Sequence, residues 1–368
     1  MPPPNLALDL ASPRWRSLKM QVRYGNSYDF VRFLAASAVL FSHHFALSGL
    51  AEPPVPGYGE DFGKLGVEVF FCLSGFLICR SLQRSGDWAE FASARVLRIL
   101  PNLAFALIVT SSATLVYYGN YANVWPHVKY VARNLLMFLN GVAYEIPGVF
   151  ADALKHAVNG PLWSLPHELW AYVLLFVAFA LGARHALWRL LFLAAVFSLI
   201  WGLTPVGESV RIRIGGLDSF QFSRLGSFFF SGALLAFARR FLEARAVLLG
   251  LTALPVLVLL RAGLPVDTLL QPLTLALAVI GLGSSKAMAR FSAGGDASYG
   301  MYIFAWPIQQ FSILLIPDFW TSMLVAFVAT VAVGYATWHA FERRTIACRS
   351  QLAMRLRRAF ALRKSPVV

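Results

Sequence analysis

The chain has 368 residues, of which 58% are hydrophobic and only 14% are charged, and its formal net charge is +14. A soluble protein of this length carries about a quarter charged residues, so the composition excludes an ordinary soluble globular protein. The basic residues lie between hydrophobic segments and do not gather in one domain. They therefore indicate membrane topology and lipid contacts, and no nucleic-acid partner is expected.

Apolar runs of about twenty residues recur along the chain and predict an all-α, polytopic integral membrane protein. About ten transmembrane helices are expected, at roughly residues 28–49, 62–81, 96–118, 166–182, 186–204, 222–238, 245–262, 267–284, 297–316 and 320–341. The apolar segment around residues 131–140 is too short to cross a bilayer, so we expect it to be re-entrant or interfacial.

The distribution of lysine and arginine predicts the orientation. Of the 32 basic residues, 23 fall in one alternating set of loops and in the two tails, which is the pattern of cytosolic segments. Both termini are therefore expected in the cytosol, and the longest loop, about 119–165, is expected to face outward. This divides the chain into a cytosolic N-terminal tail (1–27), a transmembrane domain (28–342) and a basic cytosolic C-terminal tail (343–368). The three cysteines show neither a disulfide framework nor a metal-type spacing.

The first expected span carries charged and titratable residues, which are costly in a bilayer unless they are paired or wetted. Arg32 and His43 are eleven residues apart, so they share one helix face and lie about 16 Å apart along the axis. Asp29 is one turn before Arg32 and can pair with it. His44 points about 100° away from His43, and we expect it to lie idle and wet at the outer interface.

Two carboxylates enter other predicted spans near the depth of His43. Glu68 lies in the outer part of the second span, and an intramembrane carboxylate needs a partner. In the middle of that span, Ser74 and Gly75 are interpreted as small residues that permit close helix packing. Glu168 opens the fourth span, where a carboxylate can orient an imidazole or help a hydroxyl lose its proton. Together these residues predict a polar site near the outer leaflet.

Arg95 and Arg98 open the third span from the cytosolic side. Because they are three residues apart on a helix, they share a face and can present two guanidinium groups to one polyanion. Ordinary positive-inside anchoring would explain such a pair equally well if it stood alone. Arg32 approaches the same side of the membrane, so we interpret the three arginines as one cluster.

The order of these motifs resembles acyltransferase family 3, membrane proteins that O-acylate cell-surface carbohydrates in bacteria and other acceptors elsewhere. The resemblance covers residues from about 25 to 345. The motifs that carry it are Arg32 and His43 with ten residues between them, the GV-x-x-FF-x-x-SGFLI stretch from Gly66 to Ile78, Arg95 and Arg98 followed by Pro101, the WSL-x-x-E stretch from Trp163 to Glu168, and the SY-x-x-Y stretch from Ser298 to Tyr302. One departure is Ala305 before Trp306 and Pro307, where many relatives have a histidine.

The resemblance implies an acyltransferase of class EC 2.3.1 in the bacterial inner membrane. It would move an acyl group, most simply acetyl, from cytosolic acyl-CoA to a hydroxyl of a cell-surface or exported carbohydrate. His43 is expected to act as general base or as a transient acyl carrier, and either Glu68 or Glu168 is expected to orient it. The donor acyl-CoA is expected to bind Arg32, Arg95 and Arg98. The acceptor is expected to bind Trp163, His167 and Tyr302, and no metal is expected.

A second hypothesis is a proton-coupled membrane transporter that uses His43, Glu68 and Glu168 as a relay, since such proteins need polar residues within their spans. The lack of an internal repeat and the cytosolic arginine pair weigh against it. A third option is a metal hydrolase that uses His43, His44 and His167. Adjacent histidines point to different helix faces, however, and form a poor ligand set. The identity of the acceptor and the oligomeric state stay open.

Overall fold

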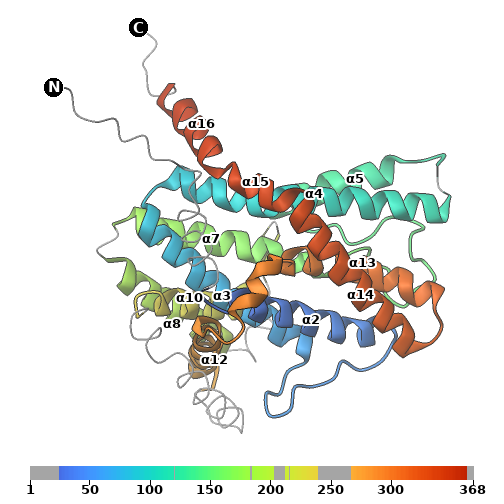
Figure 1. The fold of residues 1–368 in the computed structure, drawn as a ribbon, viewed down its shortest axis with the longest axis horizontal. Helices are drawn as coiled ribbons and strands as arrows, with labels where there is room; N and C mark the ends of the chain where they lie inside the picture. Colours follow the sequence, from blue (N-terminus) through green and yellow to red (C-terminus); the bar gives the residue numbers. More distant parts are fainter. Residues whose placement is uncertain are drawn as a thin grey trace.

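The computed structural model describes residues 25–119, 121–182, 185–202, 212–214, 216–238 and 267–362. Within these ranges the chain is almost entirely helical, and one antiparallel ribbon pairs β1 (Arg213–Ile214) with β2 (Leu217–Asp218). The helices in chain order (Figure 1) are α2 (Tyr28–Leu47), α3 (Phe62–Ser85), α4 (Trp88–Tyr118), α5 (Trp125–Leu135), α6 (Met137–Asn140), the 3₁₀-helix η1 (Gly160–Trp163), α7 (Ser164–Ala180), α8 (Ala186–Gly202), α10 (Ser219–Leu235), α12 (Asp267–Ser284), the 3₁₀-helix η3 (Ala289–Gly294), α13 (Ser298–Leu315), α14 (Phe319–Thr337), the π-helix η4 (Trp338–Glu342), α15 (Arg343–Ala347) and α16 (Arg349–Leu362).

Five helical segments of the described chain are long and apolar enough to cross a bilayer. They are Tyr28–Leu47, Phe62–Ser85, Trp88–Tyr118, Gly160–Ala180 and Phe319–Ala347. Of the ten predicted spans, nine fall on helices, and the remaining one, residues 245–262, lies outside the described residues. Helices α8 and α12 hold shorter apolar segments. A helical membrane protein is therefore confirmed, whereas ten crossings and cytosolic termini stay predictions.

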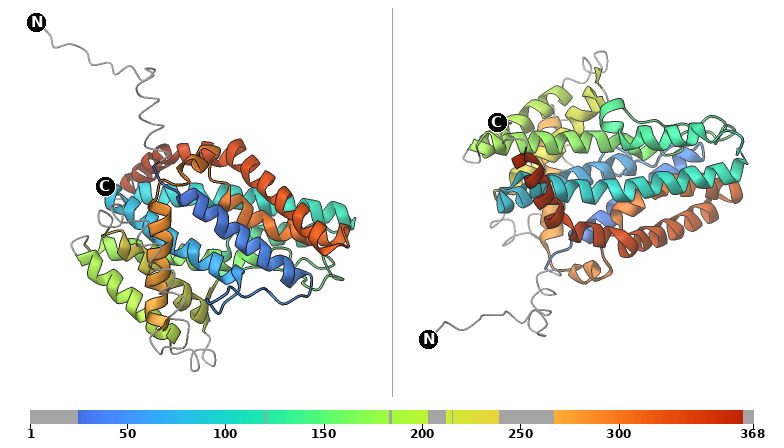
Figure 2. Two further views of the ribbon diagram at one scale, coloured as in Figure 1. Left: turned by 60° about the horizontal axis from the view of Figure 1, so that its bottom comes forward. Right: turned by 90° about the horizontal axis from the view of Figure 1, so that it is seen from above.

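Helix α3 is the central helix of the bundle, because α2, α10 and α12 all pack on it, with α12 steeply inclined to the long helices (Figure 2). Its contact with α10 requires glycine on both sides. A Cβ added to Gly75 would lie 1.8 Å from the carbonyl oxygen of Phe229, and one added to Gly232 would lie 2.1 Å from that of Cys72. The two backbones therefore touch, which confirms the packing interpretation of Gly75.

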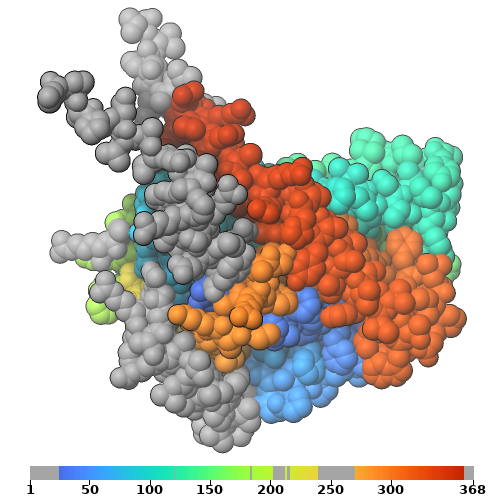
Figure 3. Space-filling view, viewed as in Figure 1, coloured from blue at the N-terminus to red at the C-terminus, as the bar shows by residue number. Residues whose placement is uncertain are grey.

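The residues that follow the last predicted span are helical and packed. Helix α14 continues through η4 into α15, and α16 packs along α4. Figure 3 shows these C-terminal helices as a diagonal band across one face of the molecule. Arg357 of α16 forms an ion pair with Asp87, which caps the start of α4, and lies 3.7 Å from Glu90. The segment predicted as a basic tail is thus docked on the bundle as far as residue 362.

The loop before α7 runs into the bundle along α13. Within it, residues 155–161 form a strap that lies against this helix. Hydrogen bonds of 2.6 to 3.0 Å join Lys155 to Gln310, Ala157 to Trp306, Asn159 to Ile303 and Pro161 to Tyr302. Gln310 is eight positions after Tyr302 on the helix, so the strap runs about 12 Å along α13. It thereby carries η1 and the first turn of α7 deep into the protein.

The segment around residues 131–140, predicted as re-entrant or interfacial, is formed by the end of α5 and by α6.

Candidate functional site

A cavity of about 80 Å³ opens between α2, α3, α4, the start of α7 and α13. Its charged lining residues are Arg32, Arg95, Arg98 and Glu168, and its hydroxyl-bearing ones are Ser74, Ser164, Tyr172, Ser298, Tyr299 and Tyr302. We call it the arginine cavity. Helix periodicity correctly predicted that Arg95 and Arg98 share a face, since both line it. The strap positions the end of the cavity that lies away from the arginines, where the hydroxyl of Tyr302 lies 2.6 Å from that of Ser164.

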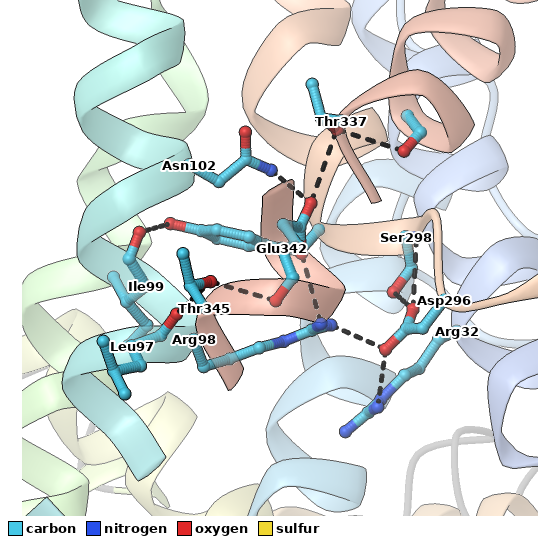
Figure 4. A network of polar contacts seen from close by, with 12 residues as sticks. Arg32, Leu97, Arg98, Ile99, Asn102, Asp296, Ser298, Thr337, Glu342 and Thr345 are labelled. Carbon is cyan, nitrogen blue, oxygen red and sulfur yellow. Dashed lines mark hydrogen bonds and ion pairs between the residues drawn. The ribbon is translucent and has the colours of Figure 1, made fainter. Parts of the chain in front are cut away.

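Arg98 pairs with two buried carboxylates (Figure 4). Its Nη2 donates to Oδ2 of Asp296 over 2.6 Å, and its Nη1 donates to Oε2 of Glu342 over 3.2 Å. Glu342 also accepts a hydrogen bond from Asn102. The side chains of Asp296 and Glu342 are only 8% and 2% exposed. Arg98 lies on α4, Glu342 ends η4 and Asp296 lies in the turn before α13, so Arg98 connects three parts of the fold.

Arg32 binds the same carboxylate, since its Nη1 donates to Oδ2 of Asp296 over 3.0 Å. The predicted pairing of Arg32 with Asp29 is therefore replaced by a pairing across helices. Asp296 lies in the turn between η3 and α13. Burial raises the pKa of its carboxyl group, but the charges of Arg98 and Arg32 and the hydrogen bonds from Ser298 outweigh it and lower the pKa to about 2. Asp296 is thus an ionised counter-ion shared by two arginines.

Arg95 differs from its two neighbours. Among the described residues, no hydrogen bond or ion pair engages it, and its buried Nε has no partner. Its guanidinium carbon lies 5.9 Å from the centre of the Tyr172 ring, within the distance of a cation–π interaction. Of the two arginines predicted to clamp a polyanion, only Arg95 retains all its donors. Arg98 lines the same cavity but also pairs with two carboxylates, so its part in a phosphate clamp stays a prediction.

Glu168 lines the arginine cavity and accepts two hydrogen bonds from hydroxyl groups. Ser74 Oγ donates over 2.7 Å, and the hydroxyl of Tyr172 donates as well. Ser74 was interpreted as a packing residue, but the structure gives it this polar role. Tyr302, predicted to bind the acceptor, also lines the cavity. The structure therefore gathers Glu168 and Tyr302 with the arginines, whereas the sequence had placed Glu168 in a separate site near the outer leaflet.

Glu68 has a different partner from the one predicted. It is fully buried and binds Arg224 of α10, whose Nε and Nη2 donate to Oε1 over 3.0 and 2.6 Å. The hydroxyl of Tyr58 donates to its other oxygen. Removing a charge from such a buried pair leaves the other charge uncompensated. Glu68 is thus the counter-ion of Arg224, and the prediction that it orients His43 is corrected.

His43 lies outside the lining of the arginine cavity. Its ring centre is 5.1 Å from that of Trp306, in an edge-to-face arrangement, and its buried Nδ1 has no hydrogen-bond partner among the described residues. Trp306 and Tyr302 are four residues apart on α13, so His43 lies one turn, roughly 6 Å, beyond the cavity end marked by Tyr302. Arg32 contacts Asp296, two residues before α13, and His43 contacts Trp306 of α13, which agrees with the prediction that they share one helix face. The hydrogen bonds of Glu168 go to Ser74 and Tyr172, so it does not orient His43.

The other two candidate histidines are held by structural hydrogen bonds. His44 is fully buried, with Nε2 3.1 Å from Ser322 Oγ, so the expectation of a wet interfacial position is wrong. His167 Nδ1 lies 2.9 Å from the carbonyl oxygen of Trp163, and its Nε2 accepts the backbone N–H of Asp218 over 3.2 Å. These partners require a neutral ring with the proton on Nδ1. Across the described residues, no group of three or more His, Cys, Asp or Glu side chains could hold a metal ion.

Sequence reasoning missed Asp296, Glu342 and Asn102. Asp296 stands two residues before the SY-x-x-Y stretch, and Glu342 is the carboxylate that directly follows the last predicted span. Both could have been flagged as carboxylates at span ends that need a basic partner. Their pairing with Arg98 crosses 198 and 244 residues of sequence, respectively, and no local pattern indicates it.

The comparisons agree with this arrangement of motifs. The family model described as "Acyltransferase domain", that of acyltransferase family 3, matches residues 26–339. The chain is 28% identical over 326 residues to an O-acetyl transferase of Shigella phage Sf6, a match that covers 87% of this chain and 95% of the relative. It is 25% identical over 356 residues to Nodulation protein 10 of Rhizobium leguminosarum bv. viciae, covering 90% and 95%. No solved structure matches it. The chain therefore belongs to acyltransferase family 3 and is an acyltransferase.

Proposed function

We propose that this enzyme transfers an acetyl group from cytosolic acetyl-CoA to a hydroxyl group of a carbohydrate at the outer face of a bacterial inner membrane. The printed name of the phage relative, an O-acetyl transferase, supports both the acetyl group and the oxygen acceptor. The asymmetric distribution of basic residues supports a cytosolic donor side. The observation that carries the proposal is the arginine cavity, which offers three guanidinium groups and only one carboxylate among its lining residues.

Coenzyme A is a polyanion, and the three arginines that line the cavity offer it complementary charge. Arg95 is the expected ligand of its phosphates, because its donors are unused and guanidinium groups bind phosphate in a bidentate way. Arg32 adds charge at the same end, since Asp296 occupies only its Nη1 among the described contacts. The thioester end would then extend toward Tyr302 and Ser164. The carboxylate of Glu168 interacts electrostatically with Arg95 and offsets part of its positive charge.

His43 is proposed as the general base. It removes the proton from the acceptor hydroxyl, whose oxygen attacks the thioester carbonyl carbon. The carbon–sulfur bond then breaks, and the sulfur of coenzyme A leaves with the proton that His43 returns. The unpartnered, buried Nδ1 supports this role, because a buried polar atom without a partner is unfavourable unless a substrate engages it. Transient acylation of His43 itself is the covalent variant of the same proposal.

The test compares two adjacent histidines of α2 in purified protein. With His43→Gln, we expect transfer of labelled acetyl from acetyl-CoA to fall by about 10²- to 10⁴-fold, the usual contribution of a general base. His44→Gln is the matched control, because glutamine can still bond to Ser322 and we expect transfer to persist. Equal activity of the two variants would remove His43 from the mechanism. No transfer by the wild-type enzyme to any carbohydrate of its host cell would refute the proposed function.

A proton-coupled transporter finds less support in the contacts. The relay would need Glu68 as a titrating group, yet Glu68 is bound by Arg224 and Tyr58.

A further inference from the structure

A second cavity, of about 390 Å³, lies beside the first turn of α7. Trp163 and His167 line it, whereas Ser164 and Glu168 line the arginine cavity. Positions 163 and 167 share one face of the helical segment, and 164 and 168 share the adjacent face, about 100° away. The same turn therefore forms part of the wall of both cavities. The remaining lining residues of the second cavity are Gly141, Val142, Tyr144, Arg213, Gly216, Leu217, Asp218 and Gln221.

The second cavity differs chemically from the arginine cavity. Its one lining guanidinium, that of Arg213, lies 3.4 Å from the one lining carboxylate, that of Asp218, so the charges balance. Trp163 and Tyr144 add two aromatic rings. Gln221 Oε1 is buried and has no hydrogen-bond partner among the described residues, which leaves an acceptor for a ligand hydroxyl. Aromatic surface combined with balanced donors and acceptors suits a neutral polyhydroxylated ring and offers little to a polyanion.

The walls of this cavity are held firmly in place. His167 bonds the carbonyl oxygen of Trp163 with one nitrogen and the backbone N–H of Asp218 with the other. Asp218 ends β2 and caps the start of α10, so His167 links the start of α7 to both of these elements. Helix α10 packs beside α7. Asp218 in turn accepts hydrogen bonds from the backbone of Phe220 and Gln221. Both ring nitrogens are used, so His167 acts as a positioning residue.

We propose that this second cavity binds a sugar of the carbohydrate acceptor next to the one that is acylated, an inference that rests on the proposed function. The acceptor chain would pass around the first turn of α7, with one sugar against Trp163 and the reacting sugar at the Ser164 and Tyr302 end of the arginine cavity. Binding energy from a non-reacting sugar would then hold the reactive hydroxyl in place. The sequence had assigned Trp163, His167 and Tyr302 to one acceptor site; the structure divides them between two cavities.

The test measures acetyl transfer from labelled acetyl-CoA to polysaccharide extracted from cells of the source organism, at varied concentrations of each substrate. With Trp163→Ala, we expect the KM for polysaccharide to rise on the order of tenfold, because one aromatic contact is lost. Arg213→Ala changes a side chain that is 75% exposed, so it carries little folding risk and should raise the same KM. The KM for acetyl-CoA should not change in either variant.

Trp125→Ala is the matched control, because Trp125 is 68% exposed on α5 and lines neither cavity. If wild-type enzyme transfers acetyl and both cavity variants keep the wild-type KM for polysaccharide, the second cavity is not an acceptor subsite. If wild-type enzyme transfers no acetyl to the polysaccharide, the proposed function itself fails. A rise in the acetyl-CoA KM with an unchanged polysaccharide KM would assign the cavity to the donor and overturn the inference.

Discussion

Arg95 and Arg98 lie three residues apart in one motif, and the structure predicts opposite effects when each is replaced by methionine. Methionine keeps much of the apolar stem of arginine and removes the charge, so the two variants are matched. Arg98→Met leaves Asp296 and Glu342 without their principal counter-ion, whereas Arg95→Met removes a guanidinium group that no described side chain binds. The first variant should lose stability, and the second should lose affinity for the donor.

The magnitudes follow from burial. Breaking a buried ion pair on one side costs about 3 to 5 kcal/mol. The Arg98 side chain is 21% exposed, and Arg32 still compensates Asp296, so the lower figure of about 3 kcal/mol applies. For a chain of this size, that corresponds to a fall in Tm of roughly 5 °C. A hydrogen bond to a charged group contributes about 1.5 to 3 kcal/mol, so Arg95→Met should weaken acetyl-CoA binding by about 10- to 150-fold.

The assay is thermal unfolding of detergent-purified protein, with and without acetyl-CoA. We expect Arg98→Met to have a lower Tm without ligand, and Arg95→Met to keep its Tm but lose the increase caused by acetyl-CoA. Suppose instead that Arg98→Met unfolds at the wild-type temperature and loses the acetyl-CoA effect as fully as Arg95→Met. The two arginines would then form an equal phosphate clamp, and the structural reading of Arg98 would be refuted.

Two further predictions concern stability. Gly75→Ala should lower Tm, because its Cβ would lie 1.8 Å from the backbone oxygen of Phe229 and force α3 away from α10. Gly25→Ala is the control, since a Cβ at Gly25 would have nothing within 4 Å. Equal Tm values for the two variants would contradict the backbone contact. Asp296 has a pKa of about 2 in the folded protein, below its unfolded value near 3.9. Its ionised form therefore adds on the order of 2 kcal/mol to the free energy of unfolding. This contribution should be complete above about pH 4 and disappear as the pH falls to about 2. Unfolding measured across this range should show a smaller pH dependence for Asp296→Asn than for wild type, and identical profiles would contradict the assignment.

Much of the fold was predictable because its signals are local. Runs of apolar residues predicted the helices, and a spacing of eleven residues predicted that Arg32 and His43 share a face. Arg32 contacts Asp296 just before α13, and His43 contacts Trp306 of α13. Residues 155–161 were not predictable in the same way. They lie in a loop without periodicity, and their position depends on side chains of α13 such as Trp306 and Gln310, which bond to backbone carbonyls of the strap.

The candidate site was predictable as a set of residues but not as a set of contacts. The motifs correctly grouped Arg32, Arg95 and Arg98, but they placed Glu168 in a separate site with His43, whereas it lines the same cavity as the arginines. Their contact partners were not predictable from local spacing. Asp29 lies one turn before Arg32 and could pair with it, but the ion pair is made by Asp296, a carboxylate 264 residues away.

Local sequence determined that this chain is a helical membrane protein, because hydrophobic length and helix periodicity are properties of short segments. The order of its motifs determined the enzyme family. Only the tertiary structure decided which carboxylate meets which arginine. Arg98 and Arg224 are therefore held by buried acids, while Arg95 has no hydrogen-bond or ion-pair partner among the described residues. A buried charge must find an opposite charge, but the distance along the chain at which it does so depends on how the helices pack.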